Sequence, residues 1–265
     1  MSGVPLLEAR DLRKSFASSA ATFARATHHI AVDGVSFSIA RGETLGIVGE
    51  SGCGKTTLAR MVVRLIEPDS GEIRFRGEDL LAARGARLRS LRRGMQIVFQ
   101  DPVASLNPRM RVGTIVGEPL TIHEPTLSRD ARRERVAAML EAVGVSADAT
   151  ARYPHEFSGG QRQRIGIARA LILRPELVVA DEPVSALDVS VGAQILDLLD
   201  RLRRDLSLTL ILISHSLPVV AQLATRVAVM QAGRIVESGP AEQVLRAPQH
   251  PYTQALIAAV PEIPA

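Results

Sequence analysis

Residues 49–57, Gly-Glu-Ser-Gly-Cys-Gly-Lys-Thr-Thr, match the pattern G-x-x-x-x-G-K-[ST] of a loop that binds phosphate groups. In such a loop the glycines let the backbone curl, so that successive N–H groups face the phosphates of a nucleotide, and the next helix adds positive partial charge. Lys55 would reach the β- and γ-phosphates, and the Thr56 hydroxyl would bind Mg²⁺. The predicted nucleotide-binding residues are Gly49, Glu50, Ser51, Gly52, Cys53, Gly54, Lys55, Thr56 and Thr57.

Lysine is otherwise almost absent from the chain. Of 32 Lys and Arg residues only Lys14 and Lys55 are lysine, so half of the lysines lie where a phosphate loop requires one. The net charge is +4 and the arginines are spread along the chain, so we interpret their clusters as solvated helix faces rather than as a nucleic-acid surface. A single cysteine excludes an internal disulfide and an iron-sulfur cluster. Cys53 is either a small residue that fits a tight turn or a thiol whose alkylation would block nucleotide entry.

Two carboxylates follow an apolar run further along the chain. Residues 177–180, Leu-Val-Val-Ala, lead directly into Asp181 and Glu182. An aspartate at the end of a buried strand would hold Mg²⁺ through its water shell, and the next glutamate would be the general base for the attacking water. Because a phosphate loop lies upstream, this pair indicates nucleotide hydrolysis.

A second segment has the features of an anion site. Residues 157–164, Phe-Ser-Gly-Gly-Gln-Arg-Gln-Arg, place a Ser-Gly-Gly turn before a helical stretch at residues 165–171. The N-terminus of that helix would attract an anion for the same physical reason as the phosphate loop does. Taken alone, the segment is more typical of an ordinary capped helix.

Strands and turns are expected to position the phosphate loop. Apolar patterning predicts strands at residues 6–13, 35–39 and 43–48, the last of which leads into the loop. Residues 17–29, between Phe16 and Ile30, have no clear period and are interpreted as a variable loop. The first third of the chain is therefore expected to be rich in β-structure.

The rest of the chain alternates helices and strands. A helix is predicted after Ser128, a candidate N-cap, with apolar residues on one face and a stop at Gly144. The aliphatic runs at residues 176–180 and 208–213 predict buried parallel strands with a helix between them. Residues 227–230 and 234–237 predict a hairpin, which a polar tail with prolines follows.

Taken together, these motifs resemble those of the nucleotide-binding subunits of ABC transporters, and the resemblance covers nearly the whole chain. The phosphate loop corresponds to Walker A, and residues 177–182 correspond to Walker B. The signature corresponds to Ser158, Gly159, Gly160 and Gln161, and the D-loop to Ser185, Ala186, Leu187 and Asp188. Gln100 corresponds to the Q-loop glutamine, and His215 to the switch histidine. Phe157 stands where leucine is commoner in the family. All six motifs occur in the order that the family shows.

The resemblance implies an α/β fold. We expect a P-loop NTPase (RecA-like) core with an N-terminal antiparallel β subdomain and an inserted α-helical subdomain. Residues 1–265 would form one nucleotide-binding domain, with the core and β subdomain at about 1–100 and 166–238, the helical signature subdomain at about 101–165 and a C-terminal tail at about 239–265.

The resemblance also implies a mechanism, in which two such domains form a head-to-tail dimer with ATP sandwiched between Walker A of one and the signature of the other. The implied catalytic residues are Glu182, His215, Gln100 and Lys55, and the implied Mg²⁺ ligands are Thr56, Gln100 and, through water, Asp181. Phe16 would stack on adenine, although a core role is nearly as compatible with its position. Ser216, Gln231 and Gly192 depart from common family residues, but none of them removes a catalytic group, so we expect an active ATPase.

Two stretches are similar to one branch of the family. Residues 99–109, and residues 250–256 with the tail to residue 261, resemble ATPase subunits of dipeptide, oligopeptide and nickel importers. The implied partners are a second ATPase subunit, either a paralogue or a second copy, two membrane permeases and, indirectly, an extracytoplasmic solute-binding protein. The segment after Gln100 would contact a permease. The residue pattern leaves the solute undecided.

The resemblance to importer ATPases also implies a location, the cytoplasmic face of the inner (plasma) membrane, as a peripheral subunit. No run approaches the roughly 18 apolar residues of a membrane-spanning helix, and the first eight residues lack the pattern of a secretory signal.

Two other functions are weighed against transport. A soluble ABC ATPase that acts on nucleic acid or ribosomes usually carries tandem cassettes or a long coiled-coil insertion, and 265 residues with a short helical insert accommodate neither. A P-loop kinase is the other alternative, but that function would not account for the Ser-Gly-Gly-Gln segment.

Overall fold

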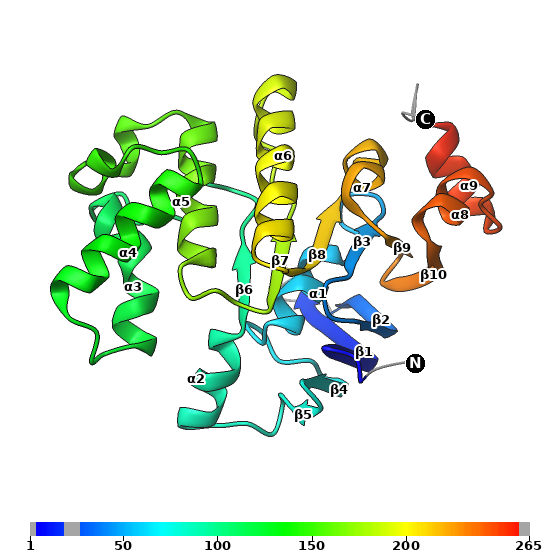
Figure 1. The fold of residues 1–265 in the computed structure, drawn as a ribbon. Coiled ribbons are helices and arrows are strands. Elements are labelled where there is room, and N and C mark those ends of the chain that lie inside the picture. Colours follow the sequence, from blue (N-terminus) through cyan, green and yellow to red (C-terminus); the bar gives the residue numbers. More distant parts are fainter. Residues whose placement is uncertain (1–3, 19–26, 260–265) are drawn as a thin grey trace. The chain divides into compact units, whose positions relative to one another are not determined.

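The computed structural model describes residues 4–18 and 27–259. These residues form two compact units (Figure 1). The first unit contains the described residues up to Arg84 and those from Ile211 onward, and the second contains Gly85–Leu210.

An antiparallel sheet forms the N-terminal part of the first unit. Its strands, in spatial order, are β2 (Thr27–Ile39), β1 (Leu7–Ser18), β4 (Ser70–Phe75) and β5 (Glu78–Asp79). Leu7 of β1 pairs with Ile39 of β2 and with Phe75 of β4, and all three side chains are fully buried. The predicted antiparallel β subdomain is thus present, and its apolar face lies in the core.

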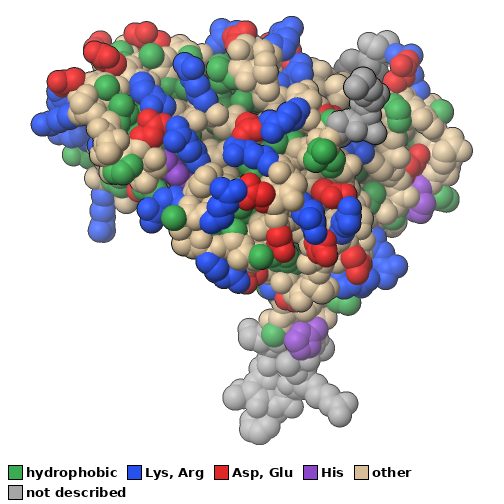
Figure 2. All heavy atoms as spheres, turned by 60° about the horizontal axis from the view of Figure 1, so that its bottom comes forward, with side chains coloured by type: hydrophobic (Ala, Val, Ile, Leu, Met, Phe, Trp, Pro, Cys, Tyr) green, Lys and Arg blue, Asp and Glu red, His purple; other side chains and the backbone are tan. Residues whose placement is uncertain are grey.

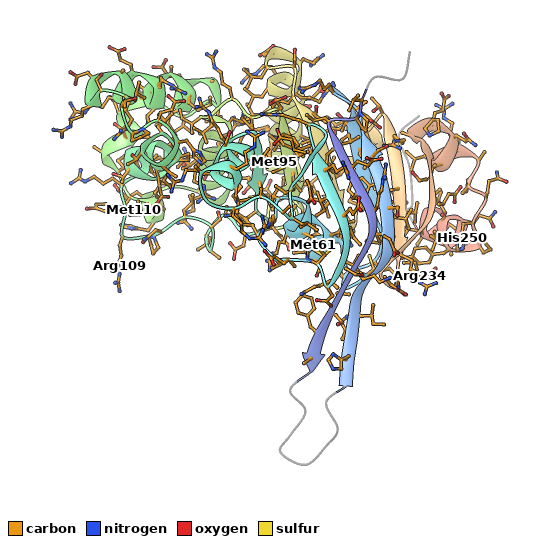
Figure 3. The ribbon with its side chains drawn as sticks, turned by 90° about the horizontal axis from the view of Figure 1, so that it is seen from below. Met61, Met95, Arg109, Met110, Arg234 and His250 are labelled. Atoms are coloured by element: carbon orange, nitrogen blue, oxygen red, sulfur yellow. The ribbon has the colours of Figure 1, made fainter. Side chains whose placement is uncertain are left out.

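The β1–β2 ribbon is longer than the sequence predicted. Residues 17–29 were expected to form a loop, but β1 continues to Ser18 and β2 begins at Thr27, with Ala17 opposite His28. The prediction failed because the ladder here consists of backbone hydrogen bonds between strands that need no apolar alternation. Figure 3 shows the two strands running on together past the part of β1 that pairs with β4. Residues 19–26 of the expected loop lie outside the described residues.

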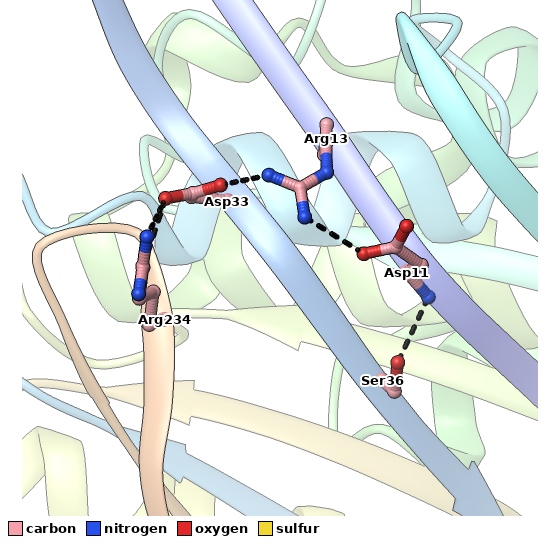
Figure 4. A network of polar contacts seen from close by, with 5 residues as sticks. All are labelled: Asp11, Arg13, Asp33, Ser36 and Arg234. Atoms are coloured by element: carbon pink, nitrogen blue, oxygen red, sulfur yellow. Dashed lines mark hydrogen bonds and ion pairs between the residues drawn. The ribbon is translucent and has the colours of Figure 1, made fainter.

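The carboxylate of Asp33 links β1, β2 and β10 (Figure 4). Its Oδ1 accepts a hydrogen bond from Arg13, and its Oδ2 accepts one of 2.8 Å from Nε of Arg234. Arg13 also contacts Asp11, whose backbone N–H donates to the hydroxyl of Ser36 at 2.8 Å. The Asp33 side chain is 15% exposed, so it is the partly buried centre of the network.

Replacing Asp33 by alanine should lower the free energy of unfolding by about 1–2 kcal/mol, since two arginines lose a shared acceptor. Urea denaturation followed by circular dichroism measures this change. Asp11→Asn is the matched control, because Asp11 is 67% exposed and asparagine tolerates its φ of 44°. Equal loss of stability in both variants would contradict the central place given to Asp33.

A second set of strands in the first unit runs in the order β10, β9, β3 and β8. The strands are β3 (Thr44–Val48), β8 (Thr209–Ser214), β9 (Arg226–Gln231) and β10 (Arg234–Pro240). The residues of β8 from Ile211 onward belong to this unit. β3 is parallel to β9, and β9 and β10 form the predicted antiparallel hairpin. Every residue of β3 is buried, as a central strand requires.

The helices of the first unit are α1 (Lys55–Val62), α7 (Leu217–Leu223), α8 (Ala241–Arg246) and α9 (Pro251–Ala258). α7 packs closely on β3, because a Cβ placed on Gly46 would lie 2.2 Å from Val220. The polar tail after residue 239 contains α8 and α9, which at six and eight residues are too short to show a clear helical period in the sequence.

The second unit is mostly helical. Its elements are α2 (Gly85–Arg93), β6 (Met95–Val98), α3 (Val112–His123), α4 (Arg129–Ala142), the 3₁₀ turns η1 (Ala147–Ala151) and η2 (Pro154–Glu156), α5 (Gly159–Leu171), β7 (Leu177–Asp181) and α6 (Val189–Asp205). The helix predicted after Ser128 is α4: the Ser128 hydroxyl accepts the Ala131 N–H at 3.2 Å, and Gly144 follows with a φ of 76°. β6 and β7 are parallel neighbours.

Acidic and basic side chains are intermixed on the face shown in Figure 2. In the second unit, Glu124 pairs with Arg93 and Arg135, and Asp200 pairs with Arg203 and Arg204. This arrangement agrees with the interpretation of the arginine clusters as solvated helix faces, and it shows in addition that some of these arginines form local ion pairs. Among the residues that the structure describes, no helix combines the length and the apolar character needed to cross a membrane.

Candidate nucleotide site

The phosphate loop lies in the first unit, between the buried strand β3 and helix α1. Two of its glycines are required by close backbone contacts. A Cβ on Gly54 would lie 1.9 Å from the carbonyl oxygen of Ala31, and one on Gly49 would lie 2.1 Å from that of Met230. Gly54 also has a φ of 105° and precedes the first residue of α1. The loop is therefore packed against β2 and β9, with no room for side chains at these glycines.

The Gly54→Ala variant should be destabilised by about 3 kcal/mol or more, because the new Cβ combines a left-handed backbone with a clash against the backbone of Ala31. Gly52→Ala is a matched control. Gly52 has a φ of 83°, but the space that its new methyl group would enter is open, so only the backbone strain of about 1–2 kcal/mol should remain. Chemical denaturation separates the two, and equal losses would show that the contact with Ala31 is unimportant.

The ammonium of Lys55 is held against the backbone of this loop. Lys55 is 4% exposed, and its Nζ donates hydrogen bonds of 2.7 Å to the carbonyl oxygens of Gly49 and Glu50. It also lies 3.7 Å from Sγ of Cys53. Burial raises the pKa of the Cys53 thiol although Lys55 acts in the opposite direction. The thiol therefore stays protonated near neutral pH, which favours the small-residue interpretation of Cys53.

Two further segments of the first unit touch the loop, and sequence reasoning missed both. The N–H of Gly233, in the β9–β10 turn, donates to the Cys53 carbonyl at 3.0 Å. The N–H of Glu50 donates to the hydroxyl oxygen of Tyr252, in α9, at 3.1 Å. Residues 250–256, which include Tyr252, were singled out in the sequence only because they resemble one importer branch. That resemblance does not indicate a contact with the phosphate loop.

Phe16 and His215 also belong to the first unit. Phe16 is 42% exposed, and the ammonium of Lys14 lies 5.7 Å from its ring centroid. Lys14 in turn donates to Asp69 at 2.7 Å, and this bond, with those from Ser15, lowers the Asp69 pKa to about 2. His215 directly follows β8 and is exposed. Lys14 thus has a structural partner, and the Phe16 ring has an accessible face.

The second unit brings Gln100 and Glu182 together across 82 residues of sequence. Nε2 of Gln100 donates to Oε2 of Glu182 at 3.1 Å. Asp181, the last residue of β7, is 2% exposed and Glu182 is 8% exposed. Glu182 has a φ of 48°, a left-handed conformation that is strained for glutamate.

The predicted signature segment forms the start of α5. Ser158 is the N-cap: its hydroxyl accepts the Gln161 N–H at 3.4 Å, and the Gln161 side chain accepts the Ser158 N–H at 3.0 Å. The helix therefore begins at Gly159 and not at residue 165, because this reciprocal capping offsets the poor helix propensity of two glycines. Gly160 is required by packing, since a Cβ there would lie 2.4 Å from Val191 of α6.

The predicted D-loop, residues 185–188, connects Glu182 to α6. The Ser185 hydroxyl donates to the Glu182 carbonyl at 3.2 Å. Asp188 is the N-cap of α6: hydrogen bonds from the Val191 N–H and the Ser190 hydroxyl hold its pKa below the ordinary value. Asp188 and Ala186 are exposed, so this loop presents polar groups to solvent.

Comparison with known proteins identifies the family. Residues 32–185 match the family described as ABC transporter, and residues 236–265 match the one described as oligopeptide/dipeptide transporter, C-terminal region. The chain is 53% identical to the oligopeptide transport ATP-binding protein OppF of Salmonella typhimurium, over 87% of this chain and 69% of that protein. It is 51% identical to the dipeptide transport ATP-binding protein DppF of Haemophilus influenzae, over 98% of this chain and 79% of that protein.

Solved structures give the same result for the fold. The chain resembles cbiO1 of Clostridium perfringens, part of an ABC transporter complex, with a TM-score of 0.77 and 29% identity over 92% of this chain and 91% of that one. It resembles the ATP-binding cassette MJ0796, in a dimer bound to ADP and Pi, with a TM-score of 0.79 and 26% identity over 89% of this chain and 98% of that one. These likenesses confirm the predicted P-loop NTPase fold. The chain therefore belongs to the ABC transporter family and is an ATP-binding cassette ATPase.

Proposed function

We propose that this chain is the ATPase subunit that powers an importer of peptides or of a related small solute. The observation that carries the proposal is the match of residues 236–265 to the oligopeptide/dipeptide transporter C-terminal region, beside relatives named for oligopeptide and dipeptide transport. In importers of this type the binding protein and the permeases select the solute.

The proposed ATP site consists of the phosphate loop, residues 49–57, with the Phe16 ring on the adenine. The partial exposure of the Phe16 ring supports its stacking on adenine, because stacking needs only an accessible π face. The buried Lys55 ammonium contacts two backbone carbonyls and a thiol, none of which neutralises it, so its charge suits the β- and γ-phosphates. The helix α1, which starts at Lys55, adds its positive end.

The proposed Mg²⁺ ligands are the Thr56 hydroxyl, Gln100 and, through water, Asp181. All three supply oxygen, the donor that Mg²⁺ prefers. Gln100 directs its amide nitrogen to Glu182, so its amide oxygen is the atom suited to a cation. When bound, Mg²⁺ would neutralise negative charge on the β- and γ-phosphates.

Hydrolysis would use Glu182 as the general base. Its carboxylate is nearly buried and oriented by Gln100, so it would accept a proton from a water molecule aligned with the γ-phosphate. The exposed His215 would donate a hydrogen bond to the γ-phosphate and stabilise the charge that develops there.

The proposed working state is a head-to-tail dimer with a paralogue or a second copy. Ser158, Gly159 and Gln161 are exposed at the positive end of α5, where they would bind the γ-phosphate of the partner's ATP. ATP would thus hold two chains together, and hydrolysis would remove the shared anion and release them.

The second unit is proposed to contact the permeases. A hollow of about 920 Å³ lies among α3, α4 and η1, in the segment that follows Gln100. Arg111, Thr114, Glu118 and Val136 are among the residues that line it. We assign residues of about 101–165 to the helical signature subdomain, about 1–100 and 166–238 to the catalytic core with its β subdomain, and about 239–265 to the tail. We also propose that the chain lies peripherally on the cytoplasmic face of the inner membrane.

Affinity purification from native membranes tests the proposal. The tagged chain should bring down two integral membrane permeases and, in the presence of a crosslinker, an ATPase partner. Retention on ribosomes or DNA without any permease would contradict transport and favour the soluble alternative.

A further inference from the structure

Tyr252 connects the C-terminal segment to the phosphate loop. Its hydroxyl oxygen accepts the Glu50 N–H at 3.1 Å, although the two residues are 202 positions apart. Tyr252 lies at the start of α9 and within the part of the chain that matches the oligopeptide/dipeptide transporter C-terminal region. The proposed function explains the phosphate loop but gives this tyrosine no role.

The contact fixes one peptide unit from both sides. The N–H of Glu50 and the carbonyl of Gly49 belong to the same planar peptide, and in it they point in opposite directions. The carbonyl accepts a hydrogen bond from Nζ of Lys55 at 2.7 Å, while the N–H donates to Tyr252. A rotation of this peptide would break both bonds, so Tyr252 and Lys55 hold the same group in place.

Glycine at position 49 makes such a restraint necessary. Gly49 has no Cβ to restrict rotation of the adjoining peptide, and the second carbonyl that binds Lys55, that of Glu50, follows directly. The position of the Lys55 ammonium therefore depends on how the 49–50 peptide is oriented.

The start of α9 is itself anchored to β10. The two carboxylate oxygens of Glu237 accept the N–H groups of Gln249 at 2.8 Å and His250 at 3.1 Å. Nδ1 of His250 then accepts the Tyr252 N–H at 3.1 Å as the cap of the helix, with Pro251 at its first position. Burial raises the pKa of Glu237, but the interactions with Gln249, Thr253 and His250 together outweigh it and leave the pKa lowered, so the anchor stays ionised at neutral pH.

We propose that Tyr252 is a positioning residue for ATP binding: its hydroxyl orients the Gly49–Glu50 peptide and, through the Gly49 carbonyl, the ammonium of Lys55. The inference rests on the proposed ATP site. It gives the C-terminal region a direct influence on nucleotide affinity.

The test is the affinity of the full chain for a fluorescent ATP analogue. Tyr252→Phe removes only the hydroxyl and keeps the ring, and we expect it to weaken binding about three- to tenfold, the effect of one lost hydrogen bond. The chain has two tyrosines, so Tyr153→Phe is the matched control and should bind as the parent does. Unchanged affinity in Tyr252→Phe, whether or not its melting temperature falls, overturns the proposal.

A spectroscopic measurement separates positioning from simple stabilisation. Labelling with 3-fluorotyrosine gives two ¹⁹F resonances, which the two Phe variants assign. Saturation with Mg-ATP should shift the Tyr252 resonance and leave that of Tyr153 in place, and an unmoved Tyr252 resonance also overturns the proposal.

The Lys55→Ala variant separates a failure of the proposed ATP site from a failure of the role given to Tyr252. If Lys55→Ala binds the analogue normally, the ATP site itself is wrong. If Lys55→Ala loses binding while Tyr252→Phe does not, only the role of Tyr252 fails.

Discussion

Lys55→Ala should reduce ATP hydrolysis about a thousandfold or more and should severely weaken ATP binding, because it removes the charge nearest the transferred phosphoryl group. The lysine is nearly buried and its ammonium is held by two backbone carbonyls, so no other described side chain of the loop brings a positive charge to this place. Steady-state phosphate release and binding of a labelled ATP analogue measure the two effects.

The other lysine gives a matched control. Lys55→Arg should also be inactive, because a planar guanidinium with five donors does not fit where a compact ammonium touches two carbonyl oxygens. Lys14→Arg should retain full activity, because Lys14 makes an ion pair with the 43% exposed Asp69 and arginine can replace it there. Turnover of Lys55→Ala close to that of the parent would refute the assigned role.

Glu182→Gln should bind ATP with nearly the parent's affinity but hydrolyse it about 10²- to 10⁴-fold more slowly, the usual contribution of a general base. Glutamine keeps the length of the side chain and an oxygen that accepts the Gln100 amide, so the local geometry should remain. Because hydrolysis is what would release the shared γ-phosphate, the variant should accumulate as a closed dimer with ATP. Size-exclusion chromatography with and without ATP detects it.

An exposed glutamate provides the comparison. Glu242→Gln, at a side chain that is 79% exposed in α8, should hydrolyse ATP at the parent's rate and show no ATP-dependent accumulation of dimer. If Glu182→Gln stays monomeric with ATP bound, the sandwich mechanism is contradicted, and parent-like turnover would remove Glu182 as the base.

Sequence patterns predicted the elements whose residues interact locally. The buried strand before the phosphate loop, the capped helix α4 and the helix α6 between the two aliphatic strands follow from short-range periodicity and from N-cap chemistry, and the structure contains all three. The phosphate loop and the carboxylate pair were found from their residue patterns, and the signature and D-loop residues were found through the resemblance to a known family. Their roles in ATP binding and hydrolysis remain predictions.

Contacts between distant segments were not predictable from patterns. The extension of β1 and β2 depends on hydrogen bonding between two strands and not on a pattern within either of them. The bond from Glu50 to Tyr252 joins residues 202 positions apart, and the bond from Gln100 to Glu182 joins residues 82 apart. No local signal encodes such partners, so the geometry of the loop required the folded chain.

The most direct test of the central claim is ATP-dependent solute uptake by proteoliposomes. They would contain the permeases that co-purify with this chain and its ATPase partner, with ATP on the side of the ATPases and the solute-binding protein with labelled peptide on the other. We predict uptake that requires this chain and falls to background when it carries Glu182→Gln. Equal uptake with the parent and with Glu182→Gln, or without the chain, would contradict the account.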